Sequence, residues 1–158
     1  MTTLTTNYLT PTGREEAWRF TPLKRLGGLH DGTAVVADRH SLTLSSSPVA
    51  GVSFALLSAL DTTPISESDD VIVARIRDFA KEVSVLTIAA NTEVTEPIFL
   101  KRTPGALDSA EFSRVLIRVE NHARVTVIIE NSGDTHLAED LEISVAPGAS
   151  LTLVSLQE

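Results

Sequence analysis

VENHARVTV, residues 119–127, is the middle one of three related stretches in the chain. IAANTEV at 88–94 and VAPGASL at 145–151 share its form: an aliphatic residue, a small or turn-forming run, and a second aliphatic residue six positions later. Apolar alternation continues after the turn in the second and third copies, as in a β-strand with one buried face. The repeat therefore predicts three strand–turn–strand units, spaced by 31 and then 26 residues.

Two kinds of β fold accommodate such units. One unit cannot bury its own apolar face, so a solenoid stacks about three or more of them. An antiparallel β-sandwich is the alternative, because regularly spaced turns are expected there as well. The pattern alone favours neither fold over the other.

Composition and charge exclude several classes of protein. The chain has 158 residues, which fits one domain, with 13 basic and 21 acidic side chains and a formal net charge of -8. An acidic balance disfavours a nucleic-acid surface, which needs clustered Lys and Arg. The absence of cysteine excludes disulfides, thiolate metal sites and a cysteine nucleophile. Apolar stretches fall far short of the roughly 20 residues of a spanning helix, and no secretory signal is visible.

The pattern changes near residue 80, which divides the chain into an N-terminal α+β region at 1–80 and a β core at 81–158. The β core holds six basic and twelve acidic side chains, so most of the negative charge lies there. Short strands separated by turn compositions are also expected in the N-terminal region, at 34–36, 41–44 and 52–56.

Two helical segments are expected in the N-terminal region. Apolar residues recur at three- and four-residue steps over 14–26, which predicts an amphipathic helix. Pro22 would divide it into two short pieces, and Gly27 would end it. A second helix is expected at about 67–80, with Ser66 as its cap and acidic residues in its first turn.

A metal site or an acid–base site would draw on the four histidines, which are His30, His40, His122 and His136. Asp38–His40 and Asp134–His136 each have an i, i+2 spacing that could present two ligands on one strand face. Solvated loop residues are the interpretation that we favour for both pairs, and His122 is expected in an exposed turn. A hydrolase would require the neighbourhoods of His30, His40 and His136 to converge.

The remaining polar motifs predict no catalytic chemistry. The chain lacks the nucleophile elbow, the phosphate loop and the dinucleotide fingerprint. The acidic run at 139–142 could hold Ca²⁺, but it lacks the ligand spacing of known loops, so a solvated strand edge is the favoured interpretation. We therefore predict no catalytic, cofactor-binding or metal-binding residues, and we expect that the protein is not an enzyme.

Trp18 is the only tryptophan and stands in a basic stretch. Its spacing favours a helix anchor that holds the N-terminal segment against the β part. The other interpretation is a contact residue for a partner protein, because Trp and Arg dominate such sites.

Two parts of the chain resemble a known family. REEAWRFTPL at 14–23 is similar to the Glu-x-Trp-Arg-(Tyr/Phe)-Thr signature of the SufB/SufD family of iron–sulfur cluster assembly proteins. EPIFL at 96–100, VENHARVTVIIENSG at 119–133 and LEISVAPGASLTLVSLQE at 141–158 resemble the start of that family's core. The resemblance is strongest to SufD of the actinobacterial type. It covers most of the chain, with a weak match over 33–65.

The resemblance implies a SufD-like, non-catalytic scaffold subunit of the cytoplasmic SufB–SufC–SufD complex. It implies a mainly β fold with N-terminal α elements, in which residues 81–158 form the first rungs of a right-handed parallel β-helix. SufB-like and SufC-like subunits would be its partners. A transient Fe–S cluster and reduced flavin would belong to the full complex, and no cofactor is expected on these residues.

The family pattern continues past Glu158 with a Trp and further rungs, so we expect an N-terminal portion of a longer protein, either an expressed piece or a proteolytic product. Most partner interfaces would then be missing, and the exposed last rung would invite self-association. An independent β-rich module that binds protein or carbohydrate is the alternative function.

Overall fold

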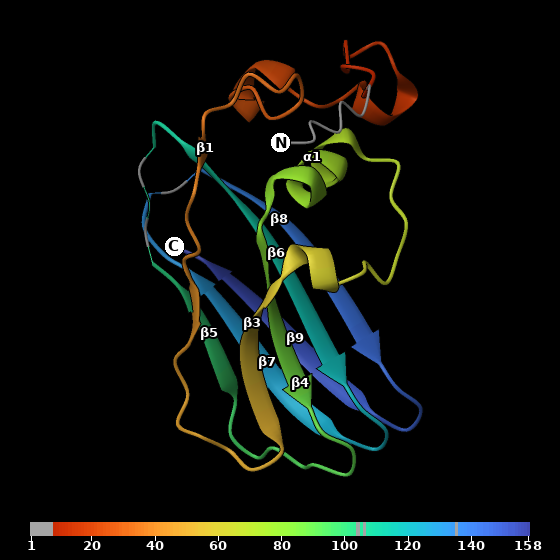
Figure 1. Ribbon diagram of the computed structural model, residues 1–158, viewed down its shortest axis with the longest axis vertical. Coiled ribbons are helices and arrows are strands. Elements are labelled where there is room, and N and C mark those ends of the chain that lie inside the picture. Colours follow the sequence, from red (N-terminus) through yellow and green to blue (C-terminus); the bar gives the residue numbers. More distant parts are fainter. Residues whose placement is uncertain (1–7, 104, 106, 135) are drawn as a thin grey trace.

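Two mixed β-sheets and a helical N-terminal layer make up the structure, a computed structural model that describes residues 8–103, 105, 107–134 and 136–158 (Figure 1). The helical segments are η1 (Glu16–Trp18), η2 (Leu23–Leu26), η3 (Ala59–Asp61) and α1 (Val71–Phe79), of which only α1 is an α-helix. The strands are β1 (Val36–Ala37), β2 (Leu42–Leu44), β3 (Val52–Ser58), β4 (Glu82–Ile88), β5 (Ile98–Arg102), β6 (Ala110–Val119), β7 (Arg124–Asn131), β8 (His136–Val145) and β9 (Ser150–Gln157).

The β core consists of three strand–turn–strand coils stacked in parallel. β4, β6 and β8 pair in parallel in one sheet, and β5, β7 and β9 pair in parallel in the other. Ile88 is the partner of Val119, and Val119 is the partner of Val145, so the three repeat copies occupy equivalent positions. The predicted repeat is therefore confirmed. The antiparallel sandwich does not describe this core, because antiparallel pairing occurs only at β2–β5 and β3–β4 among the described strands.

The turns of the three coils also repeat. Asn91, His122 and Gly148 occupy equivalent positions, and all three have a left-handed backbone, with φ of 59°, 60° and 74°. The backbone N–H of His122 donates to the carbonyl of Pro147 at 3.2 Å, which joins the second turn to the third. The imidazole of His122 lies where a Cβ on Gly148 would project, so this turn needs glycine for both its conformation and its space.

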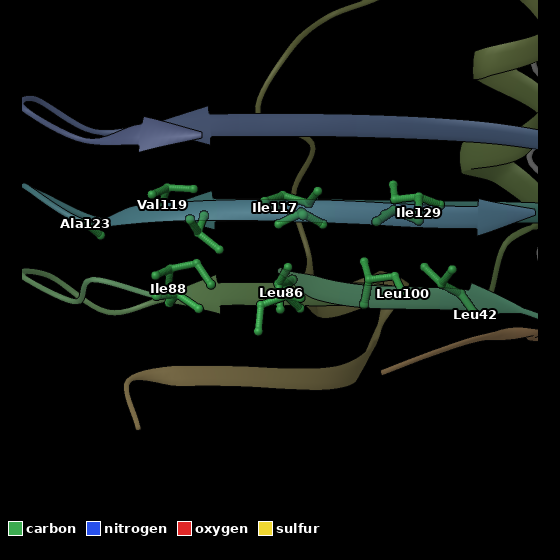
Figure 2. Packing of buried hydrophobic residues seen from close by; sticks show 13 residues of the cluster. Leu42, Leu86, Ile88, Leu100, Ile117, Val119, Ala123 and Ile129 are labelled. Atoms are coloured by element: carbon green, nitrogen blue, oxygen red, sulfur yellow. The ribbon is translucent and has the colours of Figure 1, made fainter. Parts of the chain in front are cut away.

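Stacked aliphatic side chains fill the space between the two sheets. Each stacked pair joins neighbouring coils at the same register, and burial of each such side chain contributes roughly 1.5–3 kcal/mol relative to exposure. Figure 2 shows three of these pairs: Leu86 with Ile117, Ile88 with Val119, and Leu100 with Ile129.

Helix α1 packs on the outer face of the first sheet, where its Ile76 is 1% exposed. Asp70 caps the helix, because its Oδ1 accepts hydrogen bonds from the backbone N–H groups of Ile72 and Val73 at 2.7 and 3.2 Å. The predicted start at residue 67 with Ser66 as cap is wrong. The backbone N–H of Ser66 instead donates to Glu142, 76 residues away in sequence.

The strands predicted in the N-terminal region are confirmed with shifted ends, as β1, β2 and β3. They pair with β6, β5 and β4, so both sheets contain strands from either side of residue 80. The region before β1 forms two short pieces on either side of Pro22, and Gly27 follows the second piece in a left-handed conformation. Both pieces are 3₁₀ turns and not the predicted α-helix. Phe20 is 88% exposed, and Trp18 is half-buried outside the buried clusters of the described residues, which does not support the predicted anchor.

Candidate interaction surface

A buried polar layer closes one end of the space between the sheets. Arg102 lies two residues after Leu100 on β5, so its side chain follows the apolar stack on the same face. Its side chain is 1% exposed, and it donates to Glu111 Oε1 and to Asn131 Oδ1, both at 2.9 Å. Glu139 on β8 pairs with the same guanidinium. One cation therefore ties strands of both sheets and of all three coils.

Glu139 is a partly buried carboxylate of this layer. Burial raises the pKa of Glu139 above its ordinary value, and the neighbouring positive charge of Arg102 opposes that shift. The carboxylate is the more weakly buried of the two that contact Arg102, with 18% side-chain exposure against 3% for Glu111. The raised pKa of Glu139 therefore links the stability of this layer to pH.

A second charged network joins α1 to the outer face of β8. Arg77 pairs with Asp140 at 2.7 Å and with Glu142 at 3.2 Å, and Glu142 lies 3.7 Å from Arg114 on β6. The hydrogen bond to Asp140 is the main cause that raises the pKa of Arg77. The predicted solvated edge at residues 139–142 is therefore wrong: Asp140 and Glu142 are 7% and 6% exposed, because α1 covers them and supplies the counter-charge.

The histidines do not form a common site. Asp38 and His40 could present two ligands on one strand face, but each has its own partner. His40 shares a hydrogen bond of 2.9 Å with the hydroxyl of Ser84, whereas Asp38 pairs with Lys81. His136 is the first residue of β8, and its ring lies against Gly27. The solvated-loop interpretation is confirmed for Asp38 and Asp134, which are exposed, and it is wrong for the two histidines, which are half-buried.

His30 lies 3.8 Å from Asp31. His122 is exposed in its turn, as predicted. Within the described residues, His, Asp and Glu side chains form no group of three or more that could hold a metal ion.

The exposed edges of β8 and β9 form the candidate interaction surface. Each strand pairs on one side with the second coil, and no described strand pairs with the other side. Four aliphatic side chains here are 37–46% exposed: Ile143, Val145, Val154 and Leu156. Unpaired backbone groups beside aliphatic side chains can accept a further strand by β-augmentation. The third copy of the repeat, at 145–151, indicates this surface in the sequence. No sequence pattern indicates the buried Arg102 layer.

Within the described chain, no helix combines the length and apolar composition that crossing a bilayer requires. No family model matches the chain, and no solved structure matches it.

Curated relatives match almost the whole chain. The iron–sulfur cluster assembly SufBD family protein of Mycobacterium tuberculosis (strain H37Rv) is 31% identical over 147 residues, which cover 91% of this chain and 36% of that protein. The Mycobacterium leprae protein of the same name is 29% identical over 154 residues, which cover 91% of this chain and 37% of that protein. The chain thus spans little more than a third of the length of these relatives. Over this matched length, the resemblance is confirmed, and the chain is a homologue of the SufBD-family iron–sulfur cluster assembly proteins.

Proposed function

We propose that this chain contributes part of a SufD-like scaffold for iron–sulfur cluster assembly, working with SufB-like and SufC-like subunits in the cytoplasm. The observation that carries the proposal is the homology over 91% of the chain to proteins named for that process. The scaffold is non-catalytic in its own right. The nascent cluster is the cargo of the whole assembly, any reduced flavin would belong to that assembly as well, and we expect neither group on these residues.

The stacked coils support the scaffold role. Three coils in parallel register build a regular surface whose free edge repeats the geometry of the coils before it. We infer that they are rungs of a right-handed parallel β-helix, a fold that presents long, regular faces to partner proteins. The buried Arg102 layer holds the three coils in fixed positions relative to one another, as expected of a scaffold that positions partner subunits.

A chimera tests the proposal. The matched third of the M. tuberculosis SufBD protein is replaced by this chain, and the chimera is co-expressed with the SufB-like and SufC-like subunits. We expect the partners to co-purify with the chimera, because equivalent coils present equivalent surfaces, and the unaltered M. tuberculosis protein is the positive control. A chimera that folds, as shown by circular dichroism, but retains neither partner would contradict the proposal. The independent binding-module alternative would predict that outcome.

A further inference from the structure

A cavity under the N-terminal layer has the character of a small-molecule site. It has a volume of about 240 Å³ and lies between the glycine-containing loop at Gly28–Gly32, the helix α1 and the strand β6. Apolar side chains form most of its wall, among them Leu29, Val36 and Phe112. A cavity of about 150 Å³ is large enough for benzene, so this one has room for an aromatic ring together with a polar substituent.

One cation lies in this apolar wall. Arg75 lines the cavity from α1, and its Nε is buried without a hydrogen-bond acceptor among the described residues. Its guanidinium lies 5.7 Å from the ring centre of Tyr8, a cation–π contact that leaves the planar N–H groups available to an anion. No carboxylate of the described chain lies within ion-pair distance of Arg75, whereas Arg77, two residues later, has two such partners.

The neighbouring groups support this assignment. The guanidinium of Arg75 packs against Gly32, whose backbone φ of 80° favours glycine at this point of the loop. Asp78, one turn further along α1, receives the hydroxyl hydrogen bond of Tyr8 at 2.9 Å. A buried guanidinium nitrogen without an acceptor costs free energy unless a ligand or water supplies one.

We propose that this cavity binds a small carboxylate with an aromatic or short aliphatic body. The body lies against Phe112 and Phe79, whose rings are 5.9 Å apart and tilted by 51°, and the carboxylate accepts hydrogen bonds from Arg75. Bidentate pairing with a planar guanidinium favours a carboxylate over a neutral group of the same size. The site is separate from the β8–β9 edge and does not depend on the scaffold role.

Amide chemical shifts in ¹H–¹⁵N NMR spectra of the full chain test the proposal, with sodium benzoate and benzyl alcohol as matched probes. We expect benzoate to bind with a Kd on the order of 1 mM, the affinity available to a ligand of this size. The amides of Gly32, Arg75 and Phe112 should shift most. Benzyl alcohol should bind roughly tenfold more weakly, because it lacks the charge-assisted hydrogen bond.

The Arg75→Gln variant should bind benzoate no better than it binds benzyl alcohol, and the exposed Arg25→Gln is the matched control that should bind as the unaltered chain does. If Arg75→Gln fails to fold, Arg75→Lys replaces it, and benzoate should keep an advantage over benzyl alcohol there. Equal affinities of the two probes for the unaltered chain, shifts confined to β8 and β9, or no binding of benzoate at tenfold its expected Kd would each overturn the proposal.

Discussion

Replacing Arg102 with methionine removes the most deeply buried cation of the polar layer while keeping a side chain of similar length, and it leaves Arg39 at 3.5 Å from the other carboxylate oxygen of Glu111. Glu111, which is 3% exposed, would lose its partner at 2.9 Å, and Glu139 would lose its counter-charge. Breaking a buried ion pair by removing one partner costs about 3–5 kcal/mol. For a domain of this size, we expect the melting temperature to fall by about 6–20 °C.

The loss should depend on pH, through the carboxylate that remains. Burial raises the pKa of Glu139 above the ordinary glutamate value of 4.5, so the folded state favours the protonated carboxyl. The contribution of Glu139 to stability is therefore present below pH 4.5 and is lost as the pH rises through the pKa of the folded state. Without Arg102 that pKa rises further. The stability difference between Arg102→Met and the unaltered chain should therefore be smaller at pH 5 than at pH 8.

Urea unfolding followed by the fluorescence of the single tryptophan, Trp18, and by circular dichroism measures both effects. Lys101→Met on the same strand is the matched control: its pair with Glu130 is 50% exposed on the lysine side, so it should cost less than about 1 kcal/mol. A second variant that also carries Glu111→Gln and Glu139→Gln should recover part of the loss, because no uncompensated charge stays buried. The reasoning is refuted if Arg102→Met costs no more than Lys101→Met, or if its cost is the same at both pH values.

Three further outcomes are expected. Gly148→Ala should lower the free energy of unfolding by about 1–2 kcal/mol because of its left-handed backbone alone. Urea unfolding should show a larger loss if the ring of His122 also collides with the new methyl group, and adding His122→Gly should then recover part of that excess. Equal losses with and without His122→Gly would show that the ring does not contribute. Sedimentation should show concentration-dependent self-association through the β8–β9 edge, and Ile143→Lys with Val154→Lys should abolish it; a monomer at every concentration would contradict this. After anaerobic incubation with ferrous iron and sulfide and then desalting, the chain should be colourless, and iron-dependent visible absorbance that remains would contradict the expectation that these residues hold no cluster.

The repeat made the β core predictable, because stacked coils impose the same local pattern on each copy. Ile88, Val119 and Val145 could be aligned by eye, and the structure places them at one register. The 3₁₀ pieces around Pro22 could not be told from a short α-helix, because both have nearly the same apolar spacing.

The buried charges could not be predicted, because their partners are distant in sequence. Arg77 meets Asp140 across 63 residues, and Arg102 meets Glu139 across 37. A run of acidic residues is normally solvated, so only the tertiary structure shows that α1 and β5 supply the cations. The cap of α1 was missed for the same reason: Glu142 engages Ser66 and leaves Asp70 to begin the helix.

The register of the last two coils makes the chain modular. Ala110 is the partner of His136, and Arg124 is the partner of Ser150, so the step from the second coil to the third is 26 residues in both sheets. The first step is uneven, at 31 residues between Val83 and Arg114 but 29 between Ile98 and Val127. A tandem duplication of residues 124–149 would therefore add one coil without altering any turn, and the stack could lengthen in evolution or by design through copies of this one segment.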